Sequence, residues 1–155
     1  MFALQCTPTL LSEHWQLTVN QSDLRLLEIC DRHYNVKKQK VGKRKLAIGP
    51  GESLALMTAE LDAAFIWRKE RFRLDGQSGV NCAVFRNEGK TLSSLLITEA
   101  MQIAGQRWPG ERLFTFVNKK AIRSRNPGYC FRKAGWSRCG STATGLLIFE
   151  YMPLS

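Results

Sequence analysis

The chain has 155 residues and a formal net charge of +10, and 44% of its residues are hydrophobic. This length suits one domain with a buried core, and this composition excludes an intrinsically disordered chain. So large an excess of cations in a small domain indicates a polyanionic partner, such as nucleic acid or a membrane surface.

The apolar segments are all shorter than the roughly 18 residues that a membrane helix needs, and the N-terminus lacks the basic region of a signal peptide. We therefore expect a cytoplasmic protein with no membrane partner, in the host cell cytoplasm if a phage or prophage encodes it. No CxxC pair occurs, and neither His14 nor His33 lies at ligand spacing from a cysteine, so no zinc site is expected. A need for another metal stays open. Reduced, mostly buried thiols are predicted at Cys6, Cys30, Cys82, Cys130 and Cys139.

The first predicted elements are a strand at residues 15–19 and a helix that Ser22 can cap and that runs to about Tyr34. This helix has an apolar stripe at helical spacing, formed by Leu26, Leu27 and Cys30. The same spacing places His33 and Tyr34 at the inner edge of the last turn. There they are either a structural histidine with an aromatic plug or a functional pair.

A run of six positive charges in nine positions follows at residues 37–45. Helix and strand signals both lapse here, which predicts a long loop. Such a run is either a solvated loop or an arm that contacts phosphates. Its cations are Lys37, Lys38, Lys40, Lys43, Arg44 and Lys45.

The middle of the chain predicts several strands. Residues 46–48 and 53–58 are expected to form two strands joined by a tight turn at residues 49–51, and residues 63–72 to form a third. Residues 81–86 have the apolar character of a buried strand, and a short polar loop follows them.

Residues 92–107 give the clearest helical pattern in the sequence, with Ser93 or Ser94 near the N-terminal cap. A Trp-Pro-Gly sequence ends the pattern at residues 108–110. The predicted apolar face consists of Leu92, Leu95, Leu96, Ala100, Ile103 and Ala104.

A strand at 113–117, a short helix at 127–134 and a terminal hairpin of 136–139 with 145–151 complete the order. This order predicts an α/β domain with a mixed sheet. Residues 112–149 contain eight lysines or arginines and no acidic residue. Positive charge therefore meets a strand end and a helix N-terminus, which is where anionic ligands bind in α/β sheets.

The segment Phe131–Trp136 leads from the short helix into the hairpin. It takes the place of the Tyr-x-x-x-Gly-Phe segment of the GNAT acyltransferases, and the order of elements also resembles that fold. The resemblance is strong over about residues 81–150 and weak over residues 22–150. It implies one GNAT-like domain over residues 1–155, with a core at 22–151 and a mixed, mostly antiparallel central sheet flanked by helices.

A closer similarity is to the Mom-like proteins, phage proteins that modify DNA. It rests on the pair His33-Tyr34, on Asn118 at a strand end and on the segment Gly128–Trp136. This similarity implies an enzyme that places an acetamido (carbamoylmethyl) group on the N6 amine of adenine in double-stranded DNA, with acetyl-CoA as donor substrate. The catalytic residues that it implies are His33, Tyr34, Asn118 and Tyr129.

Acyl transfer to an amine needs a positioned donor and a route for the proton of the amine. His33 has the side chain of a general base near neutral pH, and Asn118 is complementary to the edge of adenine. Tyr34 or Tyr129 can donate a proton to the leaving thiolate or stack on a base. Phe131 stands where these families often have that tyrosine, which leaves the role to Tyr129 or to no residue.

The resemblance further implies that the sheet opens between the strands at 81–86 and 113–117, with acyl-CoA at the N-terminus of the helix at 92–107. The loop before that helix retains one glycine where the GNAT pyrophosphate loop has more. Helix amides, serine hydroxyls and Lys90 can still hold a phosphate. The expected donor-binding residues are Arg86, Gly89, Lys90, Ser93, Ser94 and Asn126.

Double-stranded DNA is expected to contact the 37–45 loop and a basic face within residues 119–138. The residues expected to bind it are Lys37, Lys38, Lys40, Lys43, Arg44, Lys45, Arg123 and Arg125. Two alternatives stay open. One is a GNAT acyltransferase that acts on protein or small-molecule amines, and the other is a non-catalytic GNAT-like module that binds nucleic acid.

Overall fold

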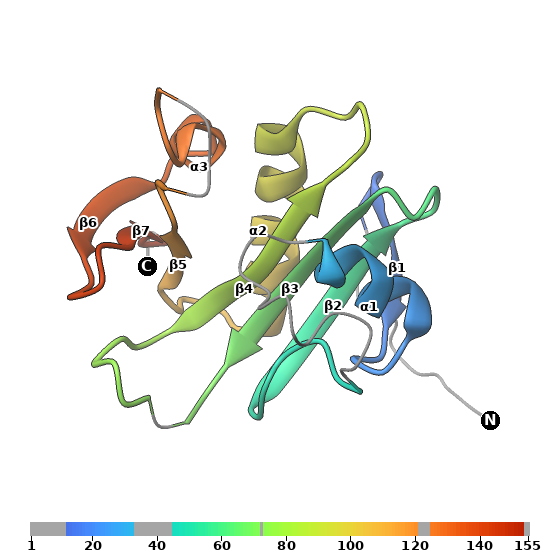
Figure 1. The fold of residues 1–155 in the computed structure, drawn as a ribbon, viewed down its shortest axis with the longest axis horizontal. Coiled ribbons are helices and arrows are strands. Elements are labelled where there is room, and N and C mark those ends of the chain that lie inside the picture. Colours follow the sequence, from blue (N-terminus) through green and yellow to red (C-terminus); the bar gives the residue numbers. More distant parts are fainter. Residues whose placement is uncertain (1–11, 33–44, 72, 121–124, 154–155) are drawn as a thin grey trace.

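The computed structural model describes residues 12–32, 45–71, 73–120 and 125–153 and shows one α/β domain (Figure 1). An open sheet of seven strands has the order β1-β2-β3-β4-β5-β7-β6. The strands are β1 (Trp15–Val19), β2 (Glu52–Thr58), β3 (Ala63–Lys69), β4 (Val80–Asn87), β5 (Leu113–Val117), β6 (Ser137–Ser141) and β7 (Leu147–Tyr151). The described helices are α1 (Leu24–Asp31), α2 (Ser93–Arg107) and α3 (Tyr129–Lys133).

The sheet is mixed but mostly antiparallel, which confirms the predicted fold class. In the described sheet, β4 and β5 run parallel, and every other pair of neighbouring strands is antiparallel. The helix α2 supplies the crossover between β4 and β5, as parallel neighbours require. It packs on one face of the sheet and α1 packs on the other, so the domain has two separate hydrophobic clusters.

Indole groups fix α2 on its face of the sheet. Trp15 Nε1 on β1 donates to the carbonyl of Leu96 at 2.8 Å, and Trp67 Nε1 on β3 donates to the carbonyl of Ala100 at 3.0 Å. Both rings are fully buried. Each indole therefore combines a large apolar contact with one directed hydrogen bond, which sets the height of the helix along the strands.

The helix α1 covers the other face with a narrower stripe. Leu26, Ile29 and Cys30 are buried against Met57 and Ile66 of the sheet. The predicted stripe is therefore confirmed, although Ile29 adds to it.

Two details of the prediction for this helix are wrong. The cap is Asp23 and not Ser22, because the Asp23 carboxylate accepts from the backbone N–H of Arg25 at 2.9 Å. The helix ends at Asp31, with Arg32 as its C-cap, which is earlier than the predicted end at about Tyr34. His33 and Tyr34 lie outside the described residues.

Residues 46–48 do not form the predicted strand. The backbone N–H of Ala47 donates to the carbonyl of Gln21, and the N–H of Ile48 donates to Gln21 Oε1, both at 3.0 Å. These amides are therefore engaged by the turn before α1, and they have no strand partner.

The apolar face predicted for α2 is rotated in the structure. Leu92 is 70% exposed and Leu95 is 43% exposed, whereas Ile97 is fully buried. Leu92 is the N-cap with an extended backbone, so it lies outside the helical periodicity. The buried residues that form the actual face are Leu96, Ile97, Ala100, Ile103 and Ala104.

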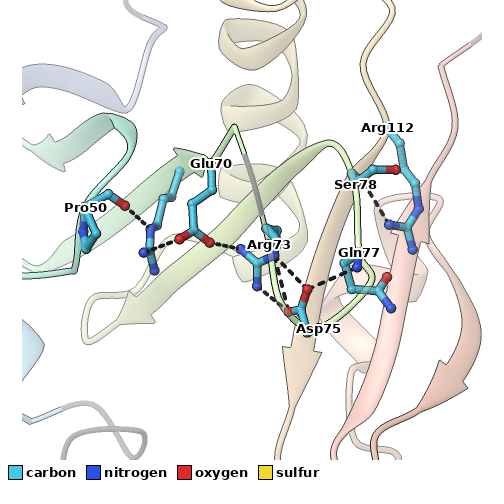
Figure 2. A network of polar contacts seen from close by, with 8 residues as sticks. Pro50, Glu70, Arg73, Asp75, Gln77, Ser78 and Arg112 are labelled. Carbon is cyan, nitrogen blue, oxygen red and sulfur yellow. Dashed lines mark hydrogen bonds and ion pairs between the residues drawn. The ribbon is translucent and has the colours of Figure 1, made fainter.

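A chain of ion pairs holds the connection from β3 to β4 (Figure 2). Arg68 and Arg73 both donate to Glu70, at 2.6 and 2.7 Å, and Arg73 also donates to Asp75 at 2.5 Å. Because Glu70 turns into this network, β3 ends at Lys69, before the predicted end at residue 72.

The same network covers Phe114 at the start of β5. The guanidinium groups of Arg73 and Arg112 lie 5.0 and 4.9 Å from the centre of this fully buried ring. Arg112 also donates to Glu150 on β7 at 2.7 Å and to the carbonyl of Ser78 at 3.0 Å. The end of the sheet where β4 and β5 begin is thus fastened by charge and cation–π contacts.

We predict that Trp67→Phe lowers the free energy of unfolding by about 1–3 kcal/mol, because it removes a buried hydrogen bond and leaves a cavity beside α2. Trp108→Phe is the matched control. Trp108 Nε1 donates at 3.2 Å to Glu52, a residue on the surface. Loss of this hydrogen bond should therefore lower the free energy of unfolding less than loss of the buried bond of Trp67. Urea unfolding monitored by circular dichroism gives both values, and an equal loss in the two variants would contradict the anchoring role of Trp67.

A second prediction concerns His14 and the buried Glu99 of α2. His14 Nδ1 lies 2.6 Å from Glu99 Oε2, and this hydrogen bond raises the pKa of His14. Burial acts to raise the pKa of Glu99, but hydrogen bonds from Ser12 and His14 outweigh it and hold that pKa below its ordinary value.

The stabilisation from His14 is complete below its unfolded pKa of about 6.5 and is lost as the pH rises through its folded pKa. The stabilisation from Glu99 is complete above its unfolded pKa of about 4.3 and is lost as the pH falls through its lowered folded pKa. His14→Gln should therefore lower stability by about 1 kcal/mol near pH 5.5 and by much less near pH 8.5. Melting temperatures at the two pH values test this, and an equal loss at both would refute it.

Candidate functional site

The strands β4 and β5 part soon after they begin. They are paired at Val80 with Leu113, at Asn81 with Phe114 and at Cys82 with Thr115. β4 then continues to residue 87 and β5 to residue 117 with no further pairing between them. This confirms the predicted opening of the sheet.

A β-bulge lies at the point of divergence. Ile66 on β3 pairs with Val84, but its neighbour Trp67 pairs with Cys82, so Ala83 is an extra residue in β4. A bulge bends its strand and increases the local twist. The bend therefore turns the second half of β4 away from β5.

An aromatic side chain from α3 fills the opening on the α2 face. The Phe131 ring is 7% exposed and lies edge-on to Phe85 of β4, with centroids 6.2 Å apart, and to Trp136, with centroids 4.9 Å apart. Trp136 Nε1 donates in turn to the Met101 sulfur of α2 at 3.0 Å. Phe131 is thus a core residue, and its ring has no proton to give to a leaving group.

A pocket of about 530 Å³ lies where the N-terminus of α2 faces α3. No side chain caps this end of α2. The first turn of a helix carries partial positive charge and unpaired amides, which favour an anion. The residues that line the pocket are Leu92, Ser93, Ser94, Asn126, Gly128, Tyr129, Cys130 and Lys133.

Three of the six residues predicted to bind the donor line this pocket: Ser93, Ser94 and Asn126. Arg86 instead donates to Glu88 at 2.7 Å, and Lys90 is exposed outside the pocket lining.

Gly89 is held by its neighbours in the loop before α2. Its N–H donates to Asn87 Oδ1 at 3.0 Å, and a Cβ atom at this position would overlap the Asp62 carboxylate. The absent side chain therefore serves close packing against Asp62. The amide of Gly89 is already engaged.

Asn87 organises this loop, and the sequence prediction missed it. Its Nδ2 donates to the carbonyl of Thr91 at 2.7 Å and to Ser93 Oγ at 3.0 Å, in addition to the bond that its Oδ1 accepts. The signal in the sequence is an amide side chain that directly follows a buried strand. It shapes the entrance to α2.

The turn before α3 depends on a glycine. Gly128 has a φ of 80°, and a Cβ atom there would lie 2.5 Å from Cζ of the buried Phe149 ring. The left-handed backbone and the close approach to Phe149 each make any residue other than glycine costly at this position. The turn brings Asn126 and Tyr129 to the wall of the pocket.

Of the predicted catalytic residues, Tyr129 and Asn118 are described. Tyr129 lines the pocket, is 53% exposed and has the Lys133 ammonium 5.9 Å from its ring centre. Asn118 follows β5, is half-buried and accepts from the backbone N–H of Lys120 at 3.1 Å. Since His33 and Tyr34 lie outside the described residues, their convergence with these two stays a prediction.

Cationic side chains after Arg112 differ from those before it. Most described cations before this point pair with carboxylates, as Arg25 does with Asp23. After Arg112, six described cations form no ion pair with a described residue: Lys119, Lys120, Arg125, Arg132, Lys133 and Arg138. We call these six the unpaired cations.

The predicted DNA-binding residues fall partly within the structure. Lys45 and Arg125 are described and exposed. The others lie outside the described residues: Lys37, Lys38, Lys40, Lys43, Arg44 and Arg123.

The cysteines of the described ranges are free thiols. Cys30 and Cys82 are buried as predicted, whereas Cys130 is half-buried and Cys139 is exposed, contrary to the prediction. Burial raises the pKa of Cys82 and of Cys130, which disfavours a thiolate nucleophile at either position. Within the described ranges no group of three or more His, Cys, Asp or Glu residues could hold a metal ion. No helix there is long and apolar enough to span a membrane.

Comparison with protein-family models finds none that matches the chain, and searches of curated proteins and of solved structures likewise return no match.

Proposed function

We propose that the protein is an acyl-CoA-dependent enzyme that modifies the N6 amine of adenine in DNA: the bond between N6 and the acyl carbon forms as the thioester bond of the donor breaks, and CoA leaves as its thiolate. The observation that carries the proposal is the parting of β4 from β5 at the Ala83 bulge, with the pocket at the uncapped end of α2 beside it. The sequence resemblance to the GNAT and Mom-like proteins implies a donor site and an acceptor site at such an opening.

The pocket has the chemistry that a CoA donor needs. Ser93 and Ser94 offer hydroxyl groups at a helix N-terminus, and Lys133 adds a positive charge, so the pyrophosphate has suitable partners. Leu92 and Tyr129 are exposed and supply apolar surface for the less polar parts of the donor.

DNA suits the charge distribution of the domain. The unpaired cations lie on or beside β5, α3 and the edge strand β6, and a polyanion would supply the counter-charges that the described residues do not. An adenine inside a duplex is out of reach of a pocket, so the base would be flipped out. Asn118 would then contact its edge, and His33, which directly follows Arg32 in the chain, would accept the proton.

We expect acetyl-CoA to bind the pocket, with Lys133→Ala weakening binding about tenfold through the loss of one charge-assisted contact. Lys90→Ala is the control, since Lys90 is an exposed cation near the same helix but outside the pocket lining. Isothermal titration calorimetry measures both. Equal weakening in the two variants, or no heat with the wild type at millimolar acetyl-CoA, would contradict this donor site.

Modified adenine should appear in the DNA of cells that express the protein. Tyr129→Phe should lower its amount about 100-fold or more if the hydroxyl acts as the acid, because general acid catalysis contributes factors of this size. Tyr129 is 53% exposed, so the variant should melt at the wild-type temperature. Mass spectrometry of digested nucleosides gives the readout. DNA that is bound but stays unmodified would favour the non-catalytic binding module instead.

A further inference from the structure

Two arginines converge on one carboxylate at the end of β4. Arg32 donates through Nε and Nη2 to the two oxygens of Glu88, at 2.6 and 2.8 Å, and Arg86 donates through Nε to Glu88 Oε2 at 2.7 Å. Each arginine comes from a different element, since Arg32 caps α1 and Arg86 lies on β4. Two guanidinium groups that share one anion form a site for an oxyanion.

This cluster lies across β4 from the pocket. Arg86 is in register with Ala64, which belongs to the hydrophobic cluster under α1, so its side chain lies on the α1 face. Figure 1 shows the end of α1 beside the end of β4. The pocket begins at the N-terminus of α2, a few residues further along the chain. The cluster and the pocket therefore flank the same end of β4 from opposite faces.

The cluster is open to solvent, unlike the ion pairs that brace the fold. The Arg32 and Arg86 side chains are 50% and 33% exposed, and Glu88 is 24% exposed. Arg73, in the network beside Phe114, is only 10% exposed. A macromolecular anion can thus reach Arg32 and Arg86, and only Nε of Arg86 is used on Glu88.

We propose that Arg32 and Arg86 form a binding site for a DNA backbone phosphate and that Glu88 occupies this site in the free protein. The inference rests on DNA as the proposed substrate. A phosphate that enters must displace the Glu88 carboxylate from the same guanidinium groups. Glu88 therefore competes with any backbone phosphate that reaches this end of β4 and weakens its binding there.

The test compares Glu88→Gln with Glu111→Gln. Both variants raise the net charge by one, but Glu111 pairs with a single half-buried cation, Lys69, whereas Glu88 pairs with two arginines. Affinity for a duplex oligonucleotide is measured by fluorescence anisotropy over a range of salt concentrations. We expect Glu88→Gln alone to steepen the log–log salt dependence by about one, which corresponds to roughly eightfold tighter binding at 0.1 M salt.

A second variant separates the site from general charge effects. Adding Arg86→Gln to Glu88→Gln should return the salt dependence to the wild-type slope, and melting temperatures show whether each variant is folded. Equal affinities for Glu88→Gln and Glu111→Gln would overturn the inference while the proposed DNA substrate stands. Failure of the wild type and all variants to bind DNA would instead overturn the proposed substrate, and this inference with it.

Discussion

The position of α2 depends on the hydrogen bonds that buried indoles donate to it. Trp15 and Trp67 reach two carbonyls one helical turn apart, from β1 and β3 respectively. Because these rings cannot move without losing both packing and a hydrogen bond, the helix has one preferred height on the sheet. That height places the uncapped first turn beside α3, and the pocket exists because the two helix ends meet there.

The opening of the sheet follows from a contrast between its two ends. Where β4 and β5 begin, Arg73 and Arg112 cover the Phe114 ring and hold the strands together. Beyond the extra residue Ala83, the ring of Phe131 packs against Phe85 and Trp136 in place of strand pairing. The strands are thus fastened at one end and held apart at the other, and neither state needs a ligand.

Strand and helix patterns in the sequence predicted most of this architecture, since β5 was expected at its observed bounds and α2 within one residue of them. Local choices were harder. Ser22 and Asp23 both suit the role of helix cap, so the sequence could not show that Asp23 takes it. Residues 46–48 form no strand because they contact Gln21, which is distant in the sequence. Of the residues that line the pocket, Ser93 and Ser94 were predicted from the sequence but Lys133 was not, since only folding brings α3 to α2. Asn87 was missed because its partners are main-chain and loop groups.

Among the described residues, the unpaired cations make the end that carries β5, α3 and β6 more positive than the rest. A polyanion exerts a torque on such a molecule before the surfaces touch, over distances of about one Debye length, roughly 10 Å at 0.1 M salt. The end that carries β5, α3 and β6 would thus be turned toward the polyanion during diffusion. A larger share of encounters would then begin at this end, so the asymmetry would raise the association rate as well as the strength of the final complex.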